Sequence, residues 1–224
     1  MIASSKKIQY FIHIGPYKTG STSFQVFCDE NRNALIERGI YYPPVGILNG
    51  QHFEIFKENG SHLLFDFSLI PESCDKVLFS SEIISSYDLE GYRKIIELFG
   101  DVTFLAVDRV IKDVALSQMR NWDRDGIGYS KIQQFINMDE SPTHNIEILA
   151  LNIRQLRMPF KILKYSKNVN AELLSLLGIY TCDEIHELIP NLNASNTSDS
   201  VFSLINYYLF KVKKFITHRK SILK

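Results

Sequence analysis

Short apolar runs alternate with longer stretches of helical periodicity along most of this chain. The runs are rich in β-branched and aromatic residues, as buried strands are. Strands are predicted at residues 8–14, 76–79, 102–107 and 160–163. Helices are predicted at residues 23–38, 52–62, 87–99, 114–122, 146–156 and 171–177. This alternation predicts an α/β fold of three layers, with a mostly parallel central sheet flanked by helices on both faces.

The last part of the sequence has a different pattern. Residues 191–200 are polar and predict a loop. Beyond them, apolar residues recur at helical spacing while the lysines fall mainly on the other faces, which indicates an amphipathic helix. We therefore expect an α/β domain over residues 1–200 and a basic amphipathic C-terminal helix over residues 201–224. That helix either packs on the domain or makes a peripheral contact with an anionic surface.

The charge balance and the cysteines exclude some classes of function. The chain holds 25 Lys and Arg and 25 Asp and Glu, and without a net positive charge it is not expected to bind nucleic acid. Its 3 cysteines lie far apart, which indicates reduced thiols in a cytoplasmic protein, and no metal-ligand spacing is visible. The apolar run at 8–14 is too short for a signal peptide, and no stretch has the length of a membrane span.

The segment between the first predicted strand and the first predicted helix has the composition of a phosphate-binding loop. It reads Gly-Pro-Tyr-Lys-Thr-Gly-Ser-Thr over residues 15–22. A loop in this position directs backbone N–H groups and the positive end of the helix dipole at an anion. Ser21 and Thr22 add hydroxyl donors, and Lys18 adds a positive charge. The order Gly-Lys-Ser/Thr of a Walker A loop is absent.

A second anion site is predicted after the strand at 102–107. Asp108 and Arg109 follow this strand, and Ser117 lies on the next predicted helix. An Arg presents several N–H donors and a Ser one hydroxyl, which together suit a phosphate group. The same strand also resembles a Walker B strand, with Asp108 as an indirect magnesium ligand, so a nucleotide kinase or NTPase remains an alternative.

Together these motifs resemble those of the PAPS-dependent sulfotransferase family, in particular its bacterial-type members. PAPS is 3'-phosphoadenosine-5'-phosphosulfate, and PAP is the product left after sulfuryl transfer. The family signature is close to P-K-T-G-T-T. This chain has P-Y-K-T-G-S-T, with Tyr17 inserted and Ser21 in place of the first Thr. The resemblance extends over residues 8–178 and implies a P-loop-like fold and the transfer of a sulfuryl group to a hydroxyl or amine.

The resemblance also implies the roles of individual residues. Arg109 and Ser117 match the residues that bind the 3'-phosphate of the donor, at the same spacing. The residues expected to bind the donor's other end are Lys18, Thr19, Gly20, Ser21 and Thr22. Lys18 is in addition expected to be catalytic, by stabilising the leaving oxygen, and no metal is required. The acceptor is expected to be a small molecule or a glycan, as in carbohydrate sulfation.

Two residues are candidates for the catalytic base that removes the acceptor's proton. Glu82 follows the strand at 76–79 and falls where cytosolic members of the family have a histidine. His52 follows a loop rich in Pro and Gly, and bacterial members often have a histidine there. The alternative roles are an ion pair or helix cap for Glu82 and a helix-starting or surface histidine for His52. His13, within the first strand, is expected in the core. A catalytically inactive PAP-binding module is a further alternative to an enzyme.

Overall fold

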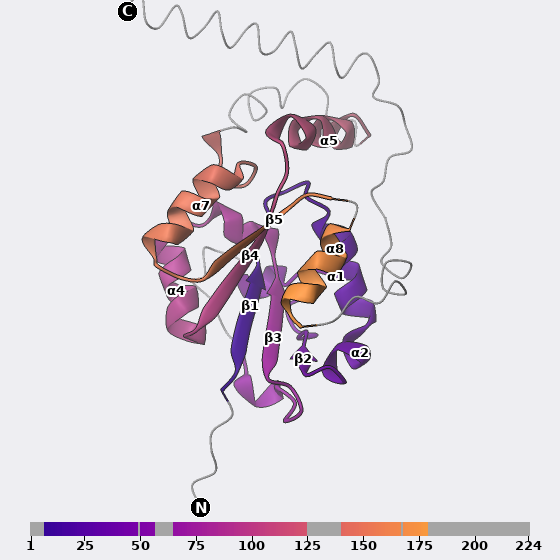
Figure 1. Cartoon of the computed structure of the whole chain (residues 1–224), viewed down its shortest axis with the longest axis vertical. Coiled ribbons are helices and arrows are strands. Elements are labelled where there is room, and N and C mark those ends of the chain that lie inside the picture. Colours follow the sequence, from indigo (N-terminus) through magenta and orange to yellow (C-terminus); the bar gives the residue numbers. More distant parts are fainter. Residues whose placement is uncertain (1–6, 49, 57–64, 125–139, 167, 179–224) are drawn as a thin grey trace, which may run out of the picture.

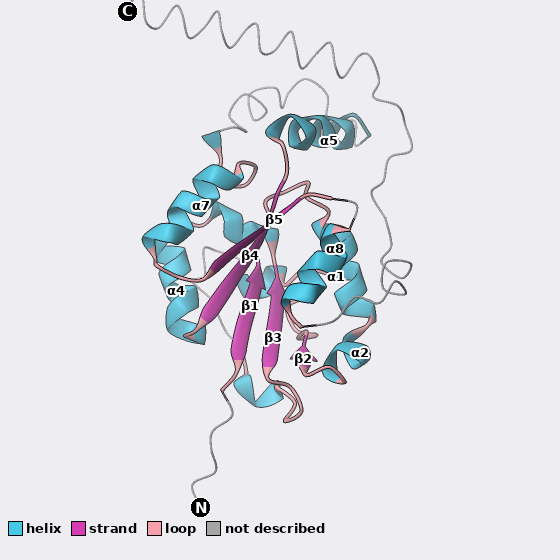
Figure 2. Cartoon of the chain, in the orientation of Figure 1, coloured by secondary structure: helices cyan, strands magenta, loops and turns pink. Residues whose placement is uncertain are grey.

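The computed structural model describes residues 7–48, 50–56, 65–124, 140–166 and 168–178. Within these residues one parallel sheet has the strand order β2-β3-β1-β4-β5 (Figures 1 and 2). The strands are β1 (Gln9–His13), β2 (Ile40–Tyr41), β3 (Lys76–Ser80), β4 (Val102–Asp108) and β5 (Phe160–Lys164). The three-layer α/β fold with a parallel central sheet is thus confirmed.

Helices cover both faces of the sheet (Figure 1). On one face lie α1 (Ser21–Glu30), α2 (Arg32–Ile36) and α8 (Val169–Leu176), and on the other lie α4 (Leu89–Phe99) and α7 (Ile146–Gln155). Helix α5 (Ile111–Arg124) lies beyond the carboxyl end of β4. A short helix, α3 (Phe53–Phe56), and two 3-10 turns at Phe67–Leu69 and Glu82–Ser86 complete the described elements.

The core follows from the alternation of side chains along buried strands. On β3, Leu78 packs with α1 and α8 while Phe79 packs with α4 on the other face. On β4, Leu105 likewise packs on the side of α1 and α8, and Phe104 packs on the side of α4. Because helices cover both faces, both sets of residues are apolar, and the strands read as continuous hydrophobic runs in the sequence.

Two local features differ from the sequence expectations. The predicted helix at 23–38 is divided at Asn31, whose backbone N–H and side-chain amide both donate to the carbonyl of Phe27. Strand β2 was not predicted, because it has only two residues and precedes two prolines. It nevertheless pairs with the start of β3 and extends the sheet by one strand.

The strand pairing brings the carboxyl ends of β1, β3 and β4 together. His13 is in register with Ser80 of β3 on one side and with Leu105 of β4 on the other. The chain first turns from β1 toward β2 and β3 and later crosses to β4 and β5, so the strand order reverses at β1. Ligands of open α/β sheets bind outside the carboxyl ends of the strands at such a reversal.

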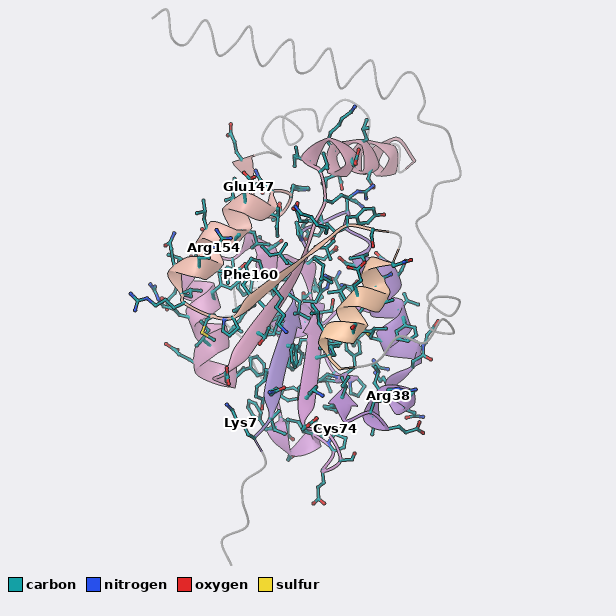
Figure 3. The ribbon with its side chains drawn as sticks, in the orientation of Figure 1. Lys7, Arg38, Cys74, Glu147, Arg154 and Phe160 are labelled. Atoms are coloured by element: carbon teal, nitrogen blue, oxygen red, sulfur yellow. The ribbon has the colours of Figure 1, made fainter. Side chains whose placement is uncertain are left out.

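Several expectations concern regions away from this edge. The C-terminal helix expected at 201–224, the loop before it and Cys182 lie outside the described residues. Cys28 and Cys74 are buried and form no disulfide within the described residues, and Cys74 lies near the amino end of β3, opposite the edge just described (Figure 3). No helix in the described part of the chain is long and apolar enough to cross a membrane.

Candidate active site

The loop between β1 and α1 has a backbone that only a few residue types adopt readily. Gly15, Lys18 and Gly20 all have positive φ, and at Lys18 the value is 65°. The Thr19 hydroxyl closes the loop by donating to the carbonyl of Pro16 at 2.7 Å. A left-handed lysine is uncommon. Here it turns the chain so that the following residues enter the helix.

The amino end of α1 is available to an anion. Gly20 stands at the N-cap, no side chain caps the helix, and the first turn carries no acidic residue. The backbone N–H groups of that turn therefore lack the acceptor that a Ser or Asp cap would supply, and the helix dipole adds to their positive potential. Ser21 begins the helix and is buried, while Lys18 and Thr22 are partly exposed. This arrangement fits a phosphate or sulfate group.

Glu82 lies against this loop, as the first residue of the turn that follows β3. A Cβ on Gly15 would stand 3.7 Å from both Cβ and Cγ of Glu82. The Ser21 side chain and the charge of Lys18 both favour the ionised form of the Glu82 carboxylate. Burial raises its pKa to about 6, because desolvation outweighs the opposing effects of Ser21 and Lys18. The loop and the first base candidate thus form one cluster.

Arg109 joins the same cluster from the end of β4. Its Nη1 donates to the carbonyl of Lys18 at 2.5 Å, and its guanidinium lies 4.3 Å from the centre of the Tyr165 ring. Its Nε is buried without a hydrogen-bond partner among the described residues. A buried N–H without an acceptor is costly, and an anionic ligand would relieve that cost. Ser117 lies partly exposed on α5, which begins two residues after Arg109.

His52, the second base candidate, has a different environment. The backbone N–H of Ser80 donates to its Nδ1 at 3.1 Å, and its Nε2 donates to the carbonyl of Pro43 at 2.9 Å. The ring is fully buried between the rings of Tyr42 and Phe79. Burial lowers its pKa to about 3. Both ring nitrogens are therefore occupied in binding the loop at 43–52 to β3, and neither is left to take a proton from an acceptor.

His13 is in the core, as expected from the sequence. Its side chain is fully buried, and its Nδ1 lies 2.8 Å from the Ser80 hydroxyl. The Gln25 amide of α1 donates to the same hydroxyl at 3.0 Å. Burial lowers the pKa of His13 to about 4. This polar group ties α1, β1 and β3 together at Ser80, two residues before Glu82 in the chain.

His144 is a residue of the site that the sequence did not reveal. The Tyr17 N–H donates to the carbonyl of Thr143 at 2.8 Å, and the rings of Tyr17 and His144 are 5.7 Å apart. The Thr143 hydroxyl lies 2.7 Å from His144 Nδ1. Burial and then the charge of Lys18 lower the pKa of His144 to about 4, so its ring is neutral at pH 7. Burial and then the charge of Glu82 raise the pKa of Tyr17.

Comparisons with known proteins are sparse. No protein-family model matches the chain, and no curated protein sequence matches it significantly. Among solved structures, a sulfotransferase from Alicyclobacillus acidocaldarius is similar over 91% of each chain, with 14% sequence identity and a TM-score of 0.47. Similarity of this degree carries no argument about chemistry, so the function has to rest on the geometry of the site.

The environment of His52 predicts how stability depends on pH. Its folded pKa of about 3 lies below the ordinary 6.5, so the unfolded chain takes up the proton first as pH falls. The stability that the neutral, buried His52 contributes is therefore complete above about pH 6.5 and is lost as pH falls toward 3. His52→Gln keeps one donor and one acceptor but does not titrate. Between pH 4 and 6 we expect the free energy of unfolding of His52→Gln to fall less steeply with decreasing pH than that of the unmodified protein. The two slopes should differ by up to about 1.4 kcal/mol per pH unit.

Urea unfolding of both proteins at a series of pH values measures these slopes. An equal slope for the two proteins would mean that His52 titrates normally in the folded state, and it would restore this histidine as a candidate base.

Proposed function

We propose that this protein is a PAPS-dependent sulfotransferase. The observation that carries the proposal is the cluster of Lys18, Ser21 and Glu82 at the uncapped amino end of α1. It combines an anion site, a mobile positive charge and a carboxylate of raised pKa. Those are the parts required to transfer a sulfuryl group in line from a phosphate to an acceptor.

The donor is expected to occupy both anion sites. The loop from Lys18 to Thr22 would bind the 5'-phosphosulfate through its backbone N–H groups and hydroxyls. Arg109 and Ser117 would bind the 3'-phosphate, and the unpartnered Nε of Arg109 supports this assignment. Arg109 has a second role in the proposal, because its bond to the Lys18 carbonyl joins the two anion sites.

Glu82 is the proposed catalytic base. Its pKa of about 6 leaves it ionised at pH 7 and makes it a stronger base than an ordinary carboxylate. As the acceptor oxygen or nitrogen bonds to sulfur, Glu82 takes the acceptor's proton. The bond between sulfur and the bridging phosphate oxygen breaks, and its electron pair stays on that oxygen, whose charge Lys18 stabilises. His52 has no role in this scheme beyond structure.

We place the acceptor on the side of Tyr17 and His144. Both rings are partly exposed, and both interact electrostatically with catalytic groups, Tyr17 with Glu82 and His144 with Lys18. A neutral imidazole and a phenol can hydrogen-bond to a hydroxyl and pack against its carbon skeleton. An acceptor hydroxyl or amine on a small molecule or a glycan is compatible with the rings of Tyr17 and His144.

The alternative of a nucleotide kinase or NTPase has less support. Its Walker B aspartate would be Asp108, and in the structure the Asp108 carboxylate forms an ion pair with Lys164 of β5. The loop also lacks the Walker A order of residues. A PAP-binding module without catalysis shares the donor site and differs only in turnover.

Calorimetric titration with PAP and with ATP–magnesium separates these classes. We expect PAP to bind in the presence of a chelator and ATP–magnesium to bind more weakly. Tighter binding of ATP with a requirement for magnesium would contradict the proposal. Binding of PAP without release of PAP from PAPS, across a panel of phenol, amine and sugar acceptors, would indicate the non-catalytic module.

Ser117→Ala tests the second anion site. The variant should weaken PAP binding by about 1.5–3 kcal/mol, the usual range for a hydrogen bond to a charged group. Binding of adenosine 5'-phosphosulfate, which has no 3'-phosphate, should not change. Arg109→Ala is the matched comparison. It should weaken the binding of both PAP and adenosine 5'-phosphosulfate, because it also removes the hydrogen bond to the Lys18 carbonyl. Equal losses for both ligands in Ser117→Ala would contradict the assignment.

Glu82→Gln tests the base. Gln keeps the shape of the side chain but cannot take the proton, so turnover should fall about 10²–10⁴-fold, while PAP affinity stays within a few-fold of the original. In the unmodified protein the base is active when ionised, so kcat should rise with pH through about 6 and then level off. Steady-state kinetics from pH 5 to 8 would show this. An active Glu82→Gln variant with the same pH profile would exclude Glu82.

A further inference from the structure

The turn before α7 is anchored to the body of the domain. The Ser141 carbonyl accepts the backbone N–H groups of His144 at 3.1 Å and of Asn145 at 2.9 Å. Asn145 in turn caps α7, because its side chain accepts the Glu147 N–H at 2.9 Å. Helix α7 packs through its buried face against α4 and the sheet. A group carried by this turn therefore has a defined position relative to the strands.

Thr143 joins this turn to the loop that follows β1. Its carbonyl accepts the Tyr17 N–H at 2.8 Å, and its hydroxyl oxygen lies 2.7 Å from His144 Nδ1. One residue thus fixes the backbone of Tyr17 and the orientation of the His144 ring, and the two rings lie 5.7 Å apart. A Cβ on Gly15 would stand 3.5 Å from the Tyr17 nitrogen and 3.7 Å from Glu82 Cγ. The two rings are therefore held close to the proposed base.

The hydroxyls of the turn decide which nitrogen of His144 carries its proton. The Ser141 and Thr143 hydroxyl oxygens are 2.7 Å apart, and the Ser141 oxygen also accepts the Thr143 N–H at 3.4 Å. When Ser141 donates to Thr143 and Thr143 donates to Nδ1, each hydroxyl proton has an acceptor, and the ring proton is on Nε2. The reverse direction would leave the Ser141 proton without an acceptor in this chain of bonds.

The other nitrogen of His144 is the one that can reach a ligand. Within the described residues the ring's hydrogen bond is at Nδ1, and the side chain is partly exposed. Burial lowers its pKa to about 4, so at pH 7 the ring is neutral and has a single proton to donate. The turn thus presents one N–H donor beside the ring of Tyr17.

We propose that His144 selects acceptors with a second oxygen next to the reacting hydroxyl or amine, and that Thr143 is the positioning residue on which this selection depends. The Nε2–H group donates to the second oxygen. The substrate class is therefore a vicinal diol or amino alcohol, as sugars carry. This inference rests on the proposed function and extends it to the chemistry of the acceptor.

The chemistry of the transfer explains why a second oxygen is needed. Glu82 takes the proton of the reacting hydroxyl, and a lone pair of the same oxygen attacks sulfur. An N–H donor at that lone pair would compete with the attack. Nε2–H therefore assists the reaction by binding a neighbouring oxygen, while the Tyr17 ring offers a face on which the carbon skeleton can pack.

Matched acceptors measure this selection directly. Catechol and phenol share one carbon skeleton, trans-cyclohexane-1,2-diol and cyclohexanol share another, and only the diols carry the second oxygen. Release of PAP at saturating PAPS gives kcat/KM for each compound. In the unmodified protein we expect the diols to be preferred about five- to tenfold, the range of a neutral hydrogen bond. A preference no larger than the statistical advantage of two equivalent hydroxyls would overturn the inference.

Three variants assign the preference to the two residues. His144→Phe keeps an aromatic ring without Nε2–H, so the preference for diols should fall to the statistical value. Thr143→Val keeps the carbonyl that binds Tyr17 and loses the hydroxyl, so the preference should fall, whereas Thr143→Ser should retain it. PAP affinity within a few-fold of the original would show that the donor site is intact. A preference that survives in His144→Phe, or that is equal in Thr143→Val and Thr143→Ser, contradicts the proposal.

NMR of the intact protein tests the tautomer independently of turnover. Long-range proton–nitrogen correlations at pH 7 distinguish Nε2–H from Nδ1–H, and the signals of His144 are those missing from His144→Phe. We expect the Nε2–H form, and an Nδ1–H form would overturn the inference. If the variants do not fold, the diol preference of the unmodified protein still decides. Transfer without that preference leaves the proposed function standing, whereas absence of transfer to every acceptor would refute the proposed function itself.

Discussion

The pairing of β1 with β3 on one side and β4 on the other is the constraint on which the site depends. This register brings Ser80, Leu105 and His13 level with one another. The residues that follow, Glu82 after β3 and Arg109 after β4, therefore reach the loop that leaves β1. A shift of either pairing by one residue would turn the strand's apolar side chains to the wrong face, so the buried core on both sides of the sheet fixes the register. The core thereby also fixes the position of Glu82 relative to the loop.

Polar groups buried around Ser80 add a second constraint, because a buried polar group is costly without a hydrogen-bond partner. The Ser80 hydroxyl contacts His13 and Gln25, and the Ser80 backbone N–H and C=O both bond to His52. Burial keeps both histidines neutral at pH 7, so this network brings no charge close to Glu82. Buried hydrogen bonds specify one arrangement more sharply than apolar contacts do. In this protein they fix the end of β3 and the start of the 3-10 turn that begins at Glu82.

The sequence was sufficient for features that depend on local pattern. The strands β1, β3, β4 and β5 coincide with short apolar runs, and the loop at 15–22 carries its chemistry in consecutive residues. It was not sufficient where a residue's role depends on its partners. The sequence leaves both His52 and Glu82 as candidate bases, and the hydrogen bonds of His52 to Pro43 and Ser80 distinguish them. His144 showed no motif, because its neighbour Tyr17 lies more than a hundred positions away in the chain. Helix α1 ends early for a similar reason, since the side chain of Asn31 competes for the carbonyl of Phe27.

Opposing effects set the pKa of the Glu82 carboxylate. A carboxylate in direct contact with a lysine would have a low pKa and would be a poor base, and one without any partner in a buried site would be protonated and inactive at pH 7. Desolvation is the larger effect here, and Ser21 and Lys18 partly offset it, which gives a pKa of about 6. Tyr17 precedes Lys18 in the same loop. Its backbone is anchored to Thr143, and its phenol responds to the charge of Glu82. Tyr17 therefore adds a ring close to Glu82, while the backbone of Lys18 is held through its carbonyl by Arg109.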